Sequence, residues 1–205
     1  MEEKTSQEYY YKNSTSPEFL EYTAVMNSLT EEERAFIRER TPVQFFKKGT
    51  ILLREGEIAN KSYFPFEGCV RQYYLIDGIE KTTFFFTEGQ SISSFQGINE
   101  KTPSKYYLEC VEDCRLTVSF HEDELEMYRR FPKFKMLCLK ETERQLGNYQ
   151  EMLAYYITSS PEERYLNLLK TRSELLNRVP QHQIASYLGV KPESLSRIRK
   201  RISLK

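Results

Sequence analysis

The spacing of hydrophobic positions changes twice along the chain and separates three regions. Between residues 43 and 120, short runs of β-branched and aromatic residues alternate with turn-forming Gly, Asp and Glu. At least seven such runs follow one another without a helix-length insert, which predicts an antiparallel β-roll of the jelly-roll type. The clearest pair flanks Asp77 and Gly78, a dipeptide that closes tight hairpins.

Helical periodicity lies on both sides of this strand region. Before it, residues 17–40 read as helical, and Thr30 with Glu33 forms the sequence of a capping box. After it, the pattern predicts a short helix over residues 121–130 and a long helix over residues 133–158. The fold class is therefore α+β.

The long helix carries hydrophobic positions alternately three and four residues apart, as in a two-stranded coiled coil. These positions are Leu139, Thr142, Leu146, Tyr149, Leu153 and Tyr156. We interpret the stripe as the seam of a homodimer. Packing of the same stripe on the protein's own roll is the alternative.

The last region predicts two helices joined by a tight turn. Ser160, Pro161 and Glu163 mark a helix start, and Gly189 suits a turn that needs a left-handed backbone conformation. Six apolar residues would face inward around that turn: Ile184, Ala185, Leu188, Val190, Leu195 and Ile198. The expected units are an arm (1–16), a roll (17–132), a dimerisation helix (133–158) and a terminal domain (159–205).

Charge is distributed unevenly, although the net charge of the chain is zero. Residues 178–205 contain seven basic side chains and one acid, so the rest of the chain is acidic. The outward positions of the last helix combine cations, hydroxyls and one acid, as a DNA-recognition helix requires. They are Lys191, Glu193, Ser194, Ser196, Arg197, Lys200 and Arg201. We expect Arg197 to read guanine and Glu193 to accept from cytosine, with Lys191, Lys200 and Arg201 on phosphates.

Composition excludes several other classes of protein. No apolar run is long enough for a bilayer, and the acidic N-terminus does not resemble a signal peptide, so a cytoplasmic protein without a membrane partner is expected. Cys110 and Cys114 would share one face of a strand; two buried core thiols are favoured, and a redox or metal role stays open. Only His121 and His182 are present, too few for a cupin-like metal enzyme, so neither enzyme activity nor a metal is expected.

Three stretches carry a resemblance to a known family. They are FKKGTILLREGE (46–57), YFPFEGCVRQYYLIDGIEKTTFFFTEGQ (63–90) and the tail pattern IA..LGV....LSRI (184–198). In this order they resemble the cyclic-AMP receptor protein/fumarate-nitrate regulator (CRP/FNR) family of bacterial transcription factors over residues 18–203. The resemblance implies an effector roll, a dimerisation helix, a helix-turn-helix domain for double-stranded DNA, and RNA polymerase as a partner.

The expected effector pocket departs from the family pattern. Ser93 and Ser94 stand where cyclic-nucleotide binders carry Gly-Glu, and Ser104 and Lys105 stand in the place of their Arg-Ser/Thr phosphate clamp. A lysine does not replace the fork of an arginine, so cyclic AMP is not the expected ligand. The N-terminus also lacks the cysteine cluster of iron–sulfur members. No cofactor is predicted, and a small-molecule effector, if one binds, stays unidentified.

Together these features predict a dimeric, sequence-specific DNA-binding transcription regulator that is not an enzyme. Two alternatives remain: a scaffold or ligand-binding protein that retains the fold, and a cupin-like enzyme. Many relatives follow the recognition helix with a β-wing, and only Ser203, Leu204 and Lys205 follow it here. DNA contacts are therefore expected from the helices alone.

Overall fold

The computed structural model describes residues 24, 26–93 and 101–203. The expected arm of residues 1–16 and the first part of the 17–40 segment lie outside them. The helices are α3 (Glu31–Arg40), α5 (His121–Arg130), α6 (Pro132–Thr158), α7 (Pro161–Thr171), α8 (Leu175–Arg178), α9 (Gln181–Tyr187) and α10 (Pro192–Ser203). The strands are β1 (Val43–Phe46), β2 (Ile51–Leu53), β3 (Lys61–Glu67), β4 (Val70–Ile76), β5 (Ile79–Phe86), β6 (Tyr107–Cys110) and β7 (Cys114–Phe120).

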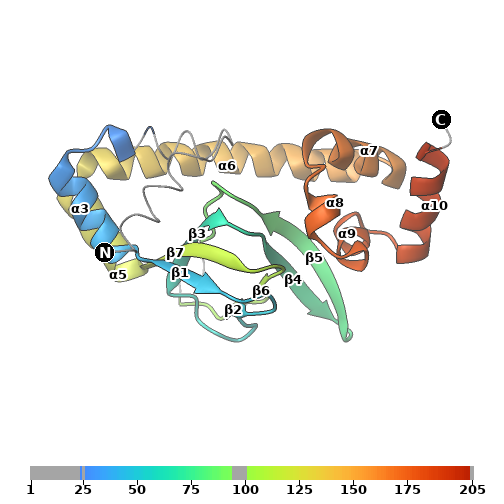
Figure 1. Cartoon of the computed structure of the whole chain (residues 1–205), viewed down its shortest axis with the longest axis horizontal. Helices are drawn as coiled ribbons and strands as arrows, with labels where there is room; N and C mark the ends of the chain where they lie inside the picture. Colours follow the sequence, from blue (N-terminus) through green and yellow to red (C-terminus); the bar gives the residue numbers. More distant parts are fainter. Residues whose placement is uncertain (1–23, 25, 94–100, 204–205) are drawn as a thin grey trace.

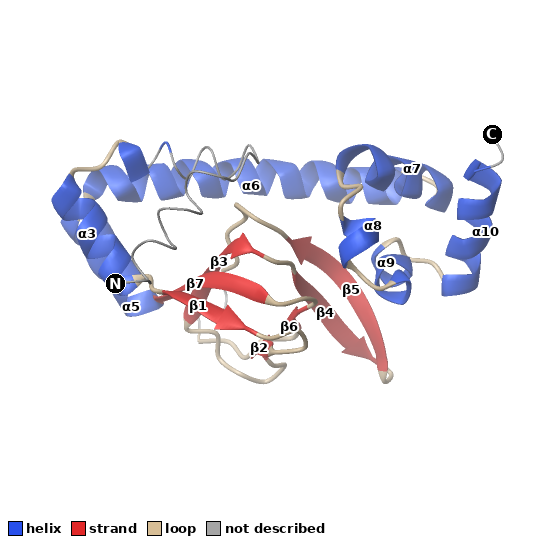
Figure 2. Cartoon of the chain, viewed as in Figure 1, coloured by secondary structure: helices blue, strands red, loops and turns tan. Residues whose placement is uncertain are grey.

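Two antiparallel sheets form the roll, which confirms the predicted fold class (Figure 2). One sheet has the order β1-β7-β3 and the other β2-β6-β4-β5. The predicted hairpin joins β4 to β5, with Ile76 opposite Ile79. Asp77 and Gly78 both have positive φ, at 51° and 74°, as the tight turn requires.

The interior of the roll is filled by alternate side chains of the strands. Val70, Cys110, Cys114 and Leu116 are completely or almost completely buried in one cluster. Alternation places every second residue of a strand on the opposite face. The outer face of the larger sheet is therefore available to another element.

Helix α6 runs along one side of the roll and continues toward the terminal helices (Figure 1). At its start, Phe131 packs edge-on against Phe36 of α3 with ring centroids 5.2 Å apart. The predicted capping box of α3 is present, because Thr30 and Glu33 each accept a backbone N–H from the other. No helix within the described ranges is long and apolar enough to cross a membrane.

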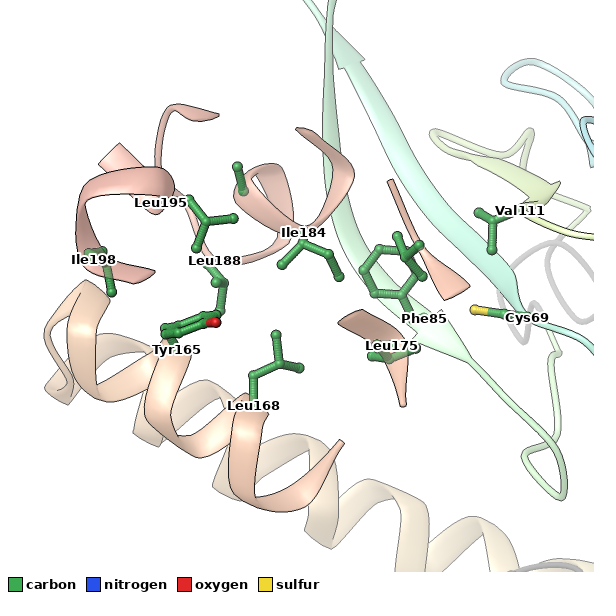
Figure 3. Packing of buried hydrophobic residues seen from close by; sticks show 12 residues of the cluster. Cys69, Phe85, Val111, Tyr165, Leu168, Leu175, Ile184, Leu188, Leu195 and Ile198 are labelled. Atoms are coloured by element: carbon green, nitrogen blue, oxygen red, sulfur yellow. The ribbon is translucent and has the colours of Figure 1, made fainter. Parts of the chain in front are cut away.

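The terminal helices pack directly on the outer face of β5. Phe85 is fully buried there and contacts Tyr187 of α9, with ring centroids 5.2 Å apart. Figure 3 shows Phe85, Cys69 and Val111 from the roll turned toward Leu175 and the helices of the terminal domain. One continuous apolar core therefore joins the two parts of the chain.

Polar contacts surround this core. The hydroxyl of Ser186 in α9 accepts from the backbone N–H of Thr82 at 2.9 Å and donates to the carbonyl of Glu80 at 3.0 Å. Arg172 donates to the carbonyl of Phe85 at 2.9 Å. These bonds hold the terminal domain in one position on the strand.

Arg178 of α8 makes the strongest of these links. Its guanidinium donates to Glu88 at 2.7 and 2.9 Å and to Glu112 at 2.6 and 2.9 Å. All three side chains are less than one-third exposed. Charge-assisted bonds of this geometry are stronger than neutral ones, particularly where water is partly excluded.

We expect Arg178→Met to lower the free energy of unfolding by about 1.5–3 kcal/mol, because Glu88 and Glu112 lose their shared cation. Urea denaturation followed by circular dichroism measures this change. Arg199→Met, at an exposed position of α10, serves as the control and should change stability little. Equal losses in the two variants would contradict a role for Arg178 in domain docking.

Candidate DNA-binding helix and effector cavity

Helices α9 and α10 are joined by the predicted tight turn. Gly189 has φ +68°, the left-handed conformation expected from the sequence. The N–H of Val190 reaches back to the carbonyl of Ala185 at 3.0 Å and closes the end of α9. Five of the six predicted inward residues are buried, and Val190 is partly buried against the same cluster.

The opposite face of α10 points to solvent at the end of the molecule farthest from α3 (Figure 1). Lys191, Glu193, Ser196, Arg197, Lys200 and Arg201 are exposed, and Ser194 is half-buried. The structure therefore brings the seven predicted DNA-binding residues together on α10 and the residue directly before it. Amphipathic packing explains this, because Leu195 and Ile198 occupy the buried stripe.

Side chains of α7 and α9 contact two residues on the exposed face of α10 and orient them. Gln181 of α9 donates to the Ser196 hydroxyl at 2.9 Å, and Arg201 forms an ion pair with Glu162 of α7. The Arg197 guanidinium lies 3.5 Å from the Ser194 hydroxyl. The sequence alone does not indicate Gln181 or Glu162, because each is distant in sequence from the α10 residue that it contacts.

Hydrogen bonds and ring contacts of Arg164 and Tyr156 connect the end of α6 to the turn at Gly189. Arg164 donates to the carbonyls of Tyr156, Ser159 and Leu188 at 3.1, 2.8 and 3.1 Å. Its guanidinium also lies over the Tyr156 ring, 4.4 Å from the centroid. The Tyr156 hydroxyl occupies the space next to Gly189, so a Cβ there would overlap it.

The predicted stripe on α6 divides into two sets. Leu139, Leu146 and Leu153 are exposed by 47%, 58% and 59%. Thr142 and Tyr149 instead line a cavity against the roll, and Tyr156 packs on the turn at Gly189. Met136 and Ile157, which the sequence reading omitted, extend the exposed leucine face at 62% and 73%.

The cavity between α6 and the roll has a volume of about 1110 Å³. Strands β3, β5 and β7 and helices α5 and α6 contribute most of its wall. Tyr149 contacts Phe84 of β5 edge-on, with ring centroids 5.3 Å apart, and both line it. A cavity of this size admits a drug-sized ligand.

The four predicted pocket residues occupy different positions. Ser93 lines the cavity and donates to the Ser62 hydroxyl at 3.0 Å. Ser104 is buried, but its hydroxyl bonds the backbone N–H and C=O of Tyr106, and neither Ser104 nor the exposed Lys105 lines the cavity. Ser94 lies outside the described residues.

Two residues of α5 that the sequence reading assigned to no pocket line this cavity. His121 and Glu124 approach each other to 4.0 Å, and burial raises the pKa of the Glu124 carboxyl. The sequence gives little indication that they line a cavity, since both occupy the polar first turn of a short helix.

Cys110 and Cys114, which are four residues apart in the sequence, are buried in the roll interior. Cys69, Cys110 and Cys114 are free and fully inaccessible. A hydrogen bond with Cys114, together with burial, raises the pKa of the Cys110 thiol. No cluster of metal-binding side chains occurs in the parts of the chain that the structure describes.

Residues 43–131 match the model of the cyclic nucleotide-binding domain family. The c-di-GMP responsive global regulator CLP of Xanthomonas campestris is 15% identical and has a TM-score of 0.67, with 85% of this chain and 92% of that chain covered. No curated protein matches the chain.

Two further structures share the fold over most of the chain. FixK2 of Bradyrhizobium japonicum is 18% identical with a TM-score of 0.66, covering 80% of this chain and 85% of that one. The catabolite activator protein of Thermus thermophilus is 19% identical with a TM-score of 0.53, covering 87% and 86%. Residues 43–131 thus match a cyclic nucleotide-binding domain, and the chain has the fold of the CRP/FNR-family regulators, which confirms the resemblance.

We expect Gly189→Ala to destabilise the protein by more than the roughly 1–2 kcal/mol that a positive φ costs a non-glycine residue, because its Cβ overlaps Tyr156. Gly78→Ala is the control, with φ +74° and nothing within 4 Å of the new Cβ. Thermal unfolding compares them. A Tyr156→Phe background should recover part of the Gly189→Ala loss, and no recovery would contradict this origin of the strain.

Proposed function

We propose that this protein is a dimeric, sequence-specific DNA-binding transcription regulator. The observation that carries the proposal is the exposed face of α10, where Lys191, Arg197 and Lys200 surround Glu193 on a helix whose other side is buried. Cations anchor such a helix on phosphates, and an exposed arginine can reach a guanine edge. The proposed units are the roll (17–132), the dimerisation helix (133–158) and the terminal domain (159–205).

The fold of the comparison proteins supports this proposal. CLP is described as a global regulator that links cell–cell signalling to virulence gene expression, and the Thermus protein as a catabolite activator. We propose double-stranded DNA and a second copy of the chain as partners, and RNA polymerase as the machinery that is regulated.

Homodimerisation is proposed through the exposed leucine face of α6. Leu139, Leu146 and Leu153 recur every seven residues, with Met136 and Ile157 on the same side. Two such helices would bury these side chains against each other in a parallel pair. The two α10 helices would then enter successive major grooves about 34 Å apart, on a near-palindromic site.

Selection of bound fragments from sheared genomic DNA, at about 150 mM salt and without added ligand, tests the function. An enriched palindrome with half-sites one helical turn apart is the expected result. Salt-sensitive binding without sequence enrichment would favour a protein that keeps the fold but no longer reads DNA. The same selection repeated with cell extract distinguishes a missing ligand from lost recognition.

We expect Arg197→Ala to relax the preference at one position of each half-site and to weaken binding there by about 1–3 kcal/mol. Lys200→Ala is the control: loss of a phosphate contact should weaken binding to all sequences similarly and lower the salt dependence. Selection of bound fragments with each variant measures both effects. An unchanged site preference in Arg197→Ala would rule out the base-reading assignment.

We expect Leu146→Glu to convert the protein to monomers, because it places paired like charges in the proposed seam. Leu146 is 58% exposed within the chain, so the monomer itself should remain folded. Sedimentation equilibrium gives the molecular mass. Asn148→Glu, an exposed change on another side of α6, should leave the dimer intact; a dimeric Leu146→Glu protein would exclude this seam.

A further inference from the structure

The cavity between α6 and the roll has a charge pattern that does not suit an anionic ligand. Its described wall contains two basic side chains of α6, Lys140 and Arg144, and two carboxylates, Glu124 and Glu141. Arg144 is held by Glu141 in a two-bonded pair at 2.7 and 2.8 Å. Lys140 is exposed to solvent. No fork of unengaged cations therefore faces the cavity from the described residues.

One end of the cavity is polar and rich in acceptors. Ser62 and Ser119 line it at 6% and 7% exposure, beside Ser93, His121 and Glu124. The Ser119 hydroxyl lies near Glu124, yet it makes no hydrogen bond of good geometry within the described structure. A buried hydroxyl without a partner costs free energy, which a ligand could recover.

The Glu124 carboxyl also lacks a full counter-charge. Burial raises its pKa, while the Ser62 hydroxyl, His121 and the nearby Ser119 hydroxyl act in the opposite direction. A buried carboxylate is stabilised most by a cation that donates hydrogen bonds to it. The group that best completes this end of the cavity is therefore a donor with positive charge.

The remainder of the cavity is apolar. Phe84 and Phe86 of β5, Phe134, Tyr149 and Met152 line it. Such a surface accepts hydrocarbon or aromatic groups through apolar contact and offers little to a ribose or a phosphate.

We propose that this cavity binds an apolar primary amine, with the ammonium group against Glu124 and Ser119 and the hydrocarbon or aromatic body along Phe84, Phe86 and Tyr149. Calling the amine an effector rests on the proposed regulatory function. Binding itself does not, because it requires only the roll and α6.

Isothermal titration calorimetry of the full chain with 4-phenylbutylamine tests this. The measurement is made at about pH 8, where imidazole side chains are generally neutral. We expect saturable binding of one molecule per chain, and at least roughly tenfold weaker binding of the matched acid 4-phenylbutyrate. Cyclic AMP should bind more weakly than the amine.

Variants locate the site. Glu124→Gln should weaken amine binding by roughly tenfold or more, and Ser119→Ala by several-fold. Glu122→Gln, an exposed carboxylate on the same helix, should leave the affinity unchanged. The methyl NMR signals of Met127 and Met152, which line the cavity, should shift on titration, whereas that of Met136, which is 62% exposed and does not line it, should not.

Three outcomes overturn the proposal. They are equal affinity for the amine and the acid, amine binding that Glu124→Gln and Ser119→Ala leave unchanged, and no saturable binding of the amine at about 1 mM. Because no DNA is present in these titrations, their failure leaves the DNA-binding proposal standing. Failure of the DNA selection likewise leaves the amine site standing.

Discussion

Strand β5 is the structural element on which the arrangement of the whole chain depends. Its consecutive phenylalanines point to opposite sides of one sheet. Phe84 and Phe86 face the cavity, while Phe85 is fully buried against Tyr187 of the terminal domain. A single strand thus separates the space that can hold a ligand from the unit that carries α10. Because both faces of β5 are closely packed, a displacement of the strand on its cavity side also shifts its contacts with the terminal domain.

Helix α6 provides a second connection between the same two regions. Tyr149 touches Phe84 in the cavity, and Tyr156, two helical turns later, fills the space beside Gly189. Arg164 fixes that end of the helix to the carbonyl of Leu188. A molecule in the cavity would therefore contact two elements of the chain: β5, which packs on α9, and α6, whose end lies against the α9–α10 turn. The orientation of the recognition helix depends on both.

Local signals in the sequence predicted most of the fold, and contacts over long sequence distances were beyond them. The hairpin at Asp77 and the capping box at Ser160 are set by neighbouring residues, so their short motifs sufficed. Heptad spacing identified one stripe on α6, but only the packed chain shows that Leu146 faces solvent while Tyr149 faces the roll. The link from Arg178 to Glu88 joins residues 90 positions apart, and no local pattern marks it.

The hydroxyl of Ser186 has a consequence for the solubility of the roll. Strand β5 is the outer strand of its sheet, and such an edge offers unpaired backbone groups to other chains. Ser186 occupies the N–H of Thr82 and the carbonyl of Glu80, next to the exposed Ile79. The terminal domain thereby shields the roll from edge-to-edge aggregation. Substitutions in α9 that loosen this contact would carry a risk of misassembly even where the exposed face of α10 is unchanged.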